Sequence, residues 1–218
     1  MMMRRVRPAL AGHAIFLDTR RLQAEPVQFS PASAGLTLLI INTNAPHALA
    51  DSEYAERCRA CERAALLLGV PSLRDLSERD LDGALGRLDD PVLIRRVRHV
   101  VTENARVLAT VSRLRDPTEP PGGVASIGPL LTASHRSLRD DYEVSSAHLD
   151  LAVEAALAAG ALGARLTGAG FGGCAIALAP AAAMGEIAAS VDAAFCRRGF
   201  VAPAYFPAEP SAGAYRIS

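Results

Sequence analysis

Apolar positions dominate two short segments near the start of the chain. Residues 13–19 and 36–42 are rich in β-branched and aliphatic side chains, a composition typical of strands. The stretch between them is polar and contains proline. The pattern therefore predicts two strands separated by this polar stretch.

A helical periodicity follows the second strand. Asp51 is placed to be its N-cap and Gly69 to be the residue just past its end. Side chains at alternating spacings of four and three form one face: Tyr54, Cys58, Cys61, Ala65 and Leu68. The spacing predicts that Tyr54 begins the buried stripe of this helix.

A longer helix is predicted to begin at Asp90-Pro91, with the proline at its first position, and to run toward Asp116. Its expected apolar face consists of Val97, Val100, Val101, Val107, Leu108, Val111 and Leu114. The sequence PTEPPGG at 117–123 predicts a loop, and a shorter helix is expected over 127–137.

The last third of the chain alternates helices and strands. Ser145 is placed to cap a helix that reaches Gly160, and strands are predicted near 163–167, 173–178 and 201–206, with a helix near 182–198 between the last two. Residues 214–217 are a candidate edge strand. Consecutive strands joined by a short loop pair antiparallel, so the predicted fold class is α+β, an antiparallel sheet with helices packed on one face.

Composition then excludes several function classes. Half of the 218 residues are hydrophobic, which predicts a packed core, and the 23 basic and 23 acidic side chains cancel. Because these charges cancel, we expect neither nucleic acid nor an anionic membrane as partner. Glycines and Pro180 interrupt the uncharged stretch at 166–185, which argues against a membrane span. Pro8, Gly12 and His13 interrupt the apolar region of a signal-like start, so we expect a cytoplasmic location. The chain has no lysine, which excludes P-loop and Schiff-base lysine chemistry.

Cysteine and histidine spacing predicts no metal site. Cys58 and Cys61 have no second pair at the spacing of zinc ligands. The five histidines also lack ligand spacing. We therefore interpret Cys58, Cys61, Cys174 and Cys196 as thiols of the core.

The sequence GAGFGG at 168–173 formally satisfies the G-x-G-x-x-G pattern of dinucleotide sites. Such a site needs a helix after the glycines, whereas CAIAL at 174–178 predicts a strand. Two interpretations remain equally open. The glycines allow backbone N–H groups to approach a phosphate, or they supply the positive φ angles of a tight turn.

A second dense segment is SHRSLRDDYEVS at 134–145. His135 lies near Asp140 and Asp141 in sequence, which is compatible with acid–base chemistry. A network of arginines and aspartates at a helix junction explains the same residues, and we favour that structural interpretation.

Four motifs in chain order carry a resemblance to a known family. They are INTN at 41–44 with His47 and SEY at 52–54 followed by Arg57 and Cys61; RHVVTE at 98–103; SHRSLRDDYEVS at 134–145; and RLTGAGFGGC at 165–174. Together they resemble the galactokinase branch of the GHMP sugar-kinase superfamily over residues 13 to about 213.

The resemblance implies a GHMP-kinase C-terminal domain at 35–218, preceded at 1–34 by a remnant of the N-terminal domain's strands. It further implies transfer of a phosphoryl group from ATP, with Mg²⁺, to galactose. In the family, the N-terminal half carries the sugar-recognition segment, the phosphate loop and an aspartate proposed as base. None of these is found in this sequence, so no catalytic residue is assigned, and a separate N-terminal half is a possible partner.

Roles transfer by resemblance to a few positions. Tyr54, within SEY, matches the tyrosine whose hydroxyl contacts the sugar. Gly168, Gly170, Gly172 and Gly173 match a motif that lies near the nucleotide phosphates and binds the cofactor region. Ala169 stands where the family usually has glycine, which puts direct phosphate contact in doubt.

Three hypotheses follow for the 218-residue chain. It is the C-terminal part of a galactokinase and inactive alone, or a non-catalytic sugar-binding or regulatory module, or a relic or half of a split enzyme. If the N-terminal domain is missing, residues 36–41 and the first strand are expected to expose apolar surface.

Overall fold

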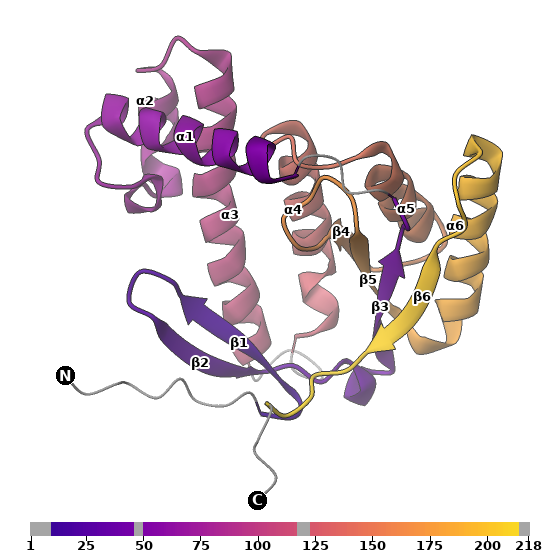
Figure 1. The fold of residues 1–218 in the computed structure, drawn as a ribbon. Coiled ribbons are helices and arrows are strands. Elements are labelled where there is room, and N and C mark those ends of the chain that lie inside the picture. Colours follow the sequence, from indigo (N-terminus) through magenta and orange to yellow (C-terminus); the bar gives the residue numbers. More distant parts are fainter. Residues whose placement is uncertain (1–9, 46–49, 117–122, 214–218) are drawn as a thin grey trace, which may run out of the picture.

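The computed structural model describes residues 10–45, 50–116 and 123–213. Two antiparallel sheets and six α-helices make an α+β fold, as predicted (Figure 1). The strands are β1 (His13–Asp18), β2 (Gln23–Gln28), β3 (Leu36–Asn42), β4 (Gly163–Leu166), β5 (Cys174–Pro180) and β6 (Ala204–Ala208). The helices are α1 (Ala50–Leu68), α2 (Leu81–Leu85), α3 (Pro91–Arg115), α4 (Gly128–Asp140), α5 (Ala147–Ala158) and α6 (Met184–Arg198).

The larger sheet has the strand order β4-β5-β3-β6, and each neighbouring pair is antiparallel. β3 comes from the first quarter of the sequence, yet it lies between β5 and β6, which come from the last quarter. Its residue Ile41 stands opposite Ala175 on one side and Tyr205 on the other. Closure of this sheet therefore depends on contacts between distant parts of the chain.

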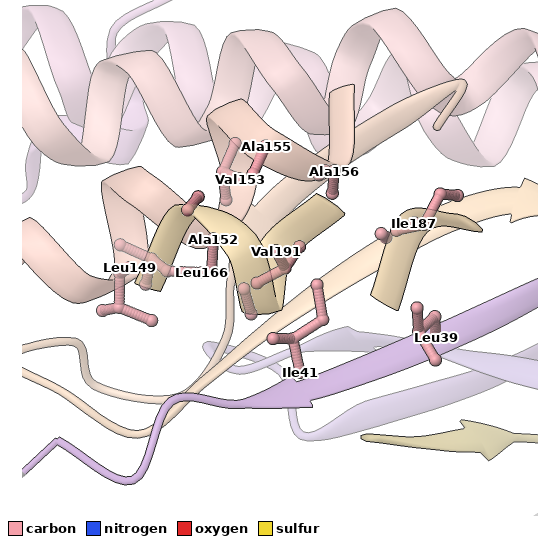
Figure 2. Close-up of a cluster of buried hydrophobic side chains, with 14 of the residues drawn as sticks. Leu39, Ile41, Leu149, Ala152, Val153, Ala155, Ala156, Leu166, Ile187 and Val191 are labelled. Carbon is pink, nitrogen blue, oxygen red and sulfur yellow. The ribbon is translucent and has the colours of Figure 1, made fainter. Parts of the chain in front are cut away.

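One face of this sheet is covered by α5 and α6 (Figure 2). Leu39 and Ile41 point from β3 into this layer and are 1% and 0% exposed. Many of the partners are alanines on β5 and α5, whose short side chains let the helices approach the sheet closely. The main core of the described chain is thus a dry layer of small and branched side chains.

Long helix α3 connects two smaller apolar clusters (Figure 1). Its N-terminal half packs with α1 and α2, and its C-terminal end reaches β2 and the 3-10 turn before α4. The carboxylate of Asp90 accepts a hydrogen bond from the N–H of Val92 at 2.8 Å, and Pro91 is the first helical residue. The predicted start of this helix is confirmed.

The polar stretch between the two predicted strands contains a further strand, β2, which pairs with β1 as a hairpin. Polar side chains make up half of β2, and buried Val27 (3% exposed) packs it on the core. In β1, Ile15 and Leu17 are about half exposed. The first strand therefore exposes apolar surface as expected.

The same expectation is wrong for Leu36, Leu39 and Ile41, which are buried because β5 and β6 flank β3 and other elements pack on one face of it. Leu38 and Ile40 are partly exposed.

Two expectations about helix faces and one about a helix cap are also wrong. Tyr54 is 50% exposed, because the packed part of α1 begins further along, near Ala60. Val107 and Leu108 are 42% and 59% exposed, because they lie on α3 beyond its contact with α1. Helix α1 already includes Asp51, which we expected to be the N-cap.

Several smaller expectations can also be compared. Ser146 caps α5 by accepting from the N–H of Leu149, one residue later than expected. The thiol of Cys196 is exposed, so its expected burial is wrong, whereas the other three cysteines are partly buried. The loop at 117–123, apart from its last residue, and the edge strand at 214–217 lie outside the described residues. Among the described helices, none combines the length and apolarity that crossing a bilayer requires.

Candidate functional site

The glycine segment forms the connection between β4 and β5. A strand, not a helix, follows it, so the rejection of a dinucleotide site is confirmed. All four candidate glycines, at 168, 170, 172 and 173, have positive φ angles. Gly168 is exposed at the rim, together with its neighbours Thr167 and Ala169, whereas Gly170 and Gly172 are buried. We call residues 167–173 the glycine loop.

Gly170 is packed closely against the backbone of the turn after α4. Its φ is +87°, and a Cβ at this position would lie 2.2 Å from the carbonyl oxygen of Val144. The same carbonyl accepts a hydrogen bond from the N–H of Phe171 at 2.7 Å. Phe171 itself has a φ of +62°, which is uncommon for a residue with a side chain. The loop is thus pressed against the backbone at Val144.

The other end of the loop is fixed by the residue that follows β3. Buried Thr43 donates both its N–H, at 3.0 Å, and its hydroxyl, at 2.7 Å, to the carbonyl oxygen of Gly173. The strand in the centre of the sheet therefore determines where the loop ends.

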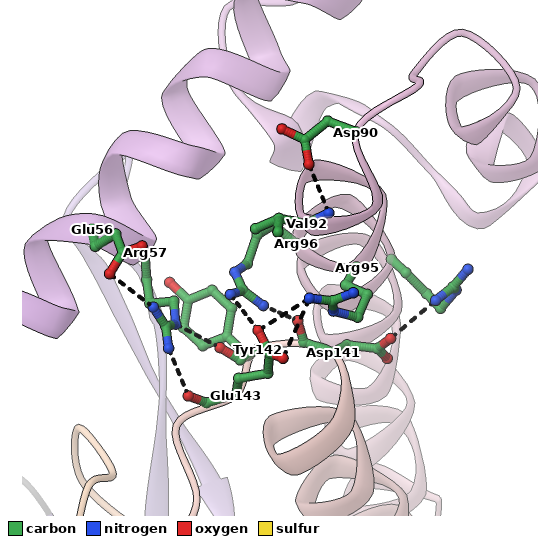
Figure 3. Close-up of polar contacts among 10 residues, drawn as sticks. Glu56, Arg57, Asp90, Val92, Arg95, Arg96, Asp141, Tyr142 and Glu143 are labelled. Atoms are coloured by element: carbon green, nitrogen blue, oxygen red, sulfur yellow. Dashed lines mark hydrogen bonds and ion pairs between the residues drawn. The ribbon is translucent and has the colours of Figure 1, made fainter.

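Residues 141–144 form a turn after α4, and arginines from two other helices bind it (Figure 3). Arg57 of α1 donates from Nε to the carbonyl of Tyr142 and from Nη2 to the carbonyl of Glu143, both at 2.9 Å. Glu143 has a φ of +55°. We call residues 141–144 the arginine-bound turn.

Helix α3 supplies the remaining arginines of this turn. Arg96, 3% exposed in its side chain, donates to the carbonyl of Asp141 and, at 2.7 Å, to the carboxylate of Glu143. Arg95 pairs with the carboxylate of Glu143 (Figure 3), and Arg98 pairs with that of Asp141. Arg96 and Arg95 hold the pKa of the Glu143 carboxyl below its usual range. The predicted network of arginines and aspartates is confirmed.

An aromatic stack lies beneath the same turn. The ring of Tyr142 stacks on the imidazole of His99, with centroids 4.4 Å apart. Burial lowers the pKa of His99 to about 4, and burial raises the pKa of Tyr142. Both rings are therefore uncharged near neutral pH.

His135 does not contact Asp140 or Asp141, its neighbours in sequence. Its Nε2 lies 3.3 Å from the carboxylate of Asp150 on α5, and its Nδ1 accepts from the N–H of Leu166 on β4. The ring is 2% exposed. His135 thus ties α4, α5 and β4 together in the interior, which favours the structural interpretation.

Tyr54 lies on α1 one helical turn before Arg57 and exposes its ring to solvent. The guanidinium of Arg57 in turn lies 5.8 Å from the centre of the Phe171 ring. Arg57 therefore connects the part of α1 that carries Tyr54 to both the arginine-bound turn and the glycine loop. The structure gathers the SEY, DDYE and glycine motifs at one end of the domain.

A cavity of about 210 Å³ lies elsewhere, between the β1–β2 hairpin and helices α3 and α4. Neither Tyr54 nor the glycine loop lines it. Within residues 10–45, 50–116 and 123–213, no three His, Cys, Asp or Glu side chains come together as metal ligands would. This part of the chain offers no metal centre of its own.

Residues 121–197 match the family model described as GHMP kinases C terminal. This part of the chain is a GHMP kinase C-terminal domain. The domain includes α4, α5, the arginine-bound turn and the glycine loop.

The GHMP kinase C-terminal domain and its flanks are similar to curated galactokinases. The chain is 48% identical to a galactokinase of Streptomyces coelicolor, covering 95% of this chain and 52% of that protein. It is 44% identical to the galactokinase of Mycobacterium tuberculosis, covering 88% of this chain and 51% of that protein. The chain therefore spans about half the length of the curated relatives it matches.

A solved structure has the same fold over nearly the whole chain. The Lactococcus lactis galactokinase, crystallised with galactose, superposes with a TM-score of 0.86 at 34% identity. The superposition covers 95% of this chain and 53% of that one. The GHMP C-terminal fold predicted from the motifs is confirmed.

Some residues of the site were missed in the sequence. The sequence motifs include Arg57 but assign it no role, and they do not include Arg96. A signal existed for Arg96, because it precedes Val97 on the buried side of α3 in a position where a charge requires partners. Those partners are the main-chain carbonyl of Asp141 and the carboxylate of Glu143, and sequence spacing does not reveal them.

Proposed function

We propose that this chain is the C-terminal half of a galactokinase, an enzyme that transfers the γ-phosphoryl group of ATP to galactose and forms galactose 1-phosphate. The observation that carries the proposal is the similarity to galactokinases along about 95% of the chain, at 48% identity in sequence and a TM-score of 0.86 in structure. The GHMP kinase C-terminal domain alone would support only a small-molecule kinase of unspecified substrate.

Tyr54 is the proposed sugar contact. Tyr54 is half exposed near the start of α1, so a ligand can reach part of its side chain. A phenol hydroxyl both donates and accepts hydrogen bonds, which suits a sugar hydroxyl. Exposure of a large aromatic side chain next to a rigid turn supports this role.

The glycine loop is the proposed wall of the nucleotide phosphate region. The exposed rim at Thr167, Gly168 and Ala169 fits this role, because a Cβ built on Gly168 would meet no atom within 4 Å. Buried Gly170 and Gly172 serve the turn itself. The rim would contact the phosphates through its backbone N–H groups. The methyl group of Ala169 would leave less room for a phosphate beside that backbone.

Mg²⁺ is proposed to enter as the ATP complex, since the described residues gather no carboxylate cluster. Phosphoryl transfer depends chiefly on positioning and charge stabilisation. In this half, the residues proposed to contribute are the sugar contact and the loop.

The hairpin at the start of the described chain supports a division near residue 34. β1 and β2 form a sheet of their own, and residues from 36 onward build the larger sheet. We propose that residues 1–34 belong to the N-terminal half and 35–218 to the C-terminal domain. Catalysis is proposed to require that other half, and the 218-residue chain is proposed to be inactive alone.

The test is a chimera in which the part of the Streptomyces coelicolor galactokinase that this chain does not match is fused to this chain. ATP-dependent formation of galactose 1-phosphate is measured for the chimera and for the 218-residue chain. We expect turnover in the chimera only. Tyr54→Phe in the chimera is expected to raise the KM for galactose about 10-fold, because it removes one hydrogen bond to a bound polar group.

Two results would contradict the proposal. A folded chimera that binds neither galactose nor ATP refutes the galactokinase assignment. Turnover by the 218-residue chain without the other half refutes the proposed inactivity. Binding of galactose without turnover in the chimera would favour a sugar-binding or regulatory module instead.

A further inference from the structure

We propose that Arg57 is a positioning residue that holds the sugar-contacting end of α1 and the glycine loop in one fixed arrangement. The proposal rests on the proposed function for the identity of the two ligands. The positioning itself rests on contacts within the described chain.

The first step is the geometry of the guanidinium. Arg57 is 12% exposed in its side chain and donates to two consecutive carbonyls, those of Tyr142 and Glu143, at 2.9 Å each. A planar guanidinium with two donors fixes both the distance and the orientation of the group it binds. The arginine-bound turn cannot rotate relative to α1 without losing both bonds.

The second step is the strain in the segments that meet there. Glu143 and Phe171 both have side chains and both adopt left-handed φ angles, +55° and +62°. Such conformations are unfavourable for a residue with a side chain and persist where surrounding contacts determine them. For Glu143 the contacts come from Arg57 and the arginines of α3.

The third step connects the turn to the loop. The carbonyl of Val144, next to Glu143, accepts from the N–H of Phe171 at 2.7 Å and leaves no room for a Cβ at Gly170. The guanidinium of Arg57 also lies near the face of the Phe171 ring. One side chain thus acts on the loop twice, through the turn and directly.

The fourth step is the position of Tyr54 on the same helix. Residues one turn apart move together with the helix backbone. Any shift of α1 relative to the loop would change the separation between the proposed sugar contact and the proposed phosphate wall. In-line phosphoryl transfer is sensitive to such shifts.

The first test uses the 218-residue chain and hydrogen exchange. Arg57→Gln is expected to speed exchange of the Phe171 amide about 10-fold, because the turn that accepts its hydrogen bond loses its clamp. Arg59→Gln is the matched control, since Arg59 is an exposed arginine two residues further along the same helix. In Arg59→Gln, the Phe171 amide is expected to exchange as fast as in the unsubstituted chain.

The second test uses the chimera. Arg57→Gln is expected to raise the KM for both galactose and ATP, whereas Tyr54→Phe raises that for galactose alone. The double variant is expected to be non-additive for galactose, because one residue acts through the other. Arg57→Lys, which keeps the charge without the planar fork, is expected to recover part of the loss.

The outcomes separate the two proposals. Equal exchange at Phe171 in Arg57→Gln and Arg59→Gln overturns the clamp, even if the chimera is an active galactokinase. Faster exchange in Arg57→Gln with an inactive chimera refutes the proposed function and leaves the clamp standing. If Arg57→Gln does not fold, Arg57→Lys takes its place, and unchanged exchange in that variant counts against the clamp.

Discussion

The layer between the larger sheet and helices α5 and α6 differs in kind from the arginine-bound turn. In the layer, β3 contributes Leu39 and Ile41 to a cluster composed largely of alanine, valine and leucine, with hardly any exposed surface (Figure 2). In the turn, backbone carbonyls and carboxylates are bound by arginines from α1 and α3 (Figure 3). Both regions are rigid, but by different physical means.

Apolar packing is non-directional, so it stabilises the layer without fixing the orientation of any particular backbone carbonyl. Charged hydrogen bonds are directional and define the turn atom by atom. The proposed ligand-contacting residues lie beside the second region. Directional bonds are found where a chain has to hold an uncommon backbone conformation, such as that of Glu143.

The largest expected effect is a cavity in the layer. Ile41→Ala is expected to lower the free energy of unfolding by about 3 kcal/mol, because Ile41 is 0% exposed and central in the sheet. Urea unfolding of the 218-residue chain measures the change. The loss is expected to be the same at pH 5 and pH 7, since no charge is involved.

Leu17→Ala is the control for that prediction. Leu17 on β1 is 51% exposed, so its truncation is expected to cost less than about 0.5 kcal/mol. Equal losses from Ile41→Ala and Leu17→Ala would mean that the two strands are buried alike, contrary to the structure.

The contact between loop and turn is tested by a pair of glycines. Gly170→Ala is expected to cost about 2 kcal/mol, because the residue combines a φ of +87° with a Cβ position 2.2 Å from the Val144 carbonyl oxygen. Gly168→Ala meets a similar φ of +78° but open space, and about 1 kcal/mol is expected. Thermal unfolding compares the two, and indistinguishable values would argue against the close approach.

A pH dependence of stability is expected from His99 of α3, whose ring stacks on Tyr142 of the turn. Above pH 6.5, His99 is neutral in both the folded and the unfolded chain. Between pH 6.5 and about 4, the unfolded chain binds a proton that buried His99 does not. Stability is therefore expected to fall as the pH is lowered through this window, by at most about 1.4 kcal/mol per pH unit.

His99→Gln removes this proton, so its stability is expected to depend less on pH between 4 and 6.5. Urea midpoints at several pH values measure the difference from the unsubstituted chain. Parallel curves for the two proteins would show that His99 is not buried in its neutral form.

Much of the fold was predictable from local patterns. The start of α3 at Pro91, the strand after the glycine motif and the antiparallel pairing of β4 with β5 follow from caps, periodicity and short connections. β2 was not predicted, because half of its side chains are polar and it contains Pro26, and its pairing with β1 is a tertiary contact. Tyr54 was assigned to a buried face, because spacing gives a helix face but not how far the neighbouring helix extends along it.

The sequence by itself determined the fold class, the residues of most helices and strands, and the motifs that point to a galactokinase-like C-terminal domain. These properties depend on neighbours within a few residues, so the local sequence pattern predicts them. Only the tertiary structure decided that β3 lies between β5 and β6, that His135 pairs with Asp150, and that Arg57 bridges α1, the turn and the glycine loop. Such contacts join residues on different elements, and they arise from the packing of whole elements rather than from any one segment.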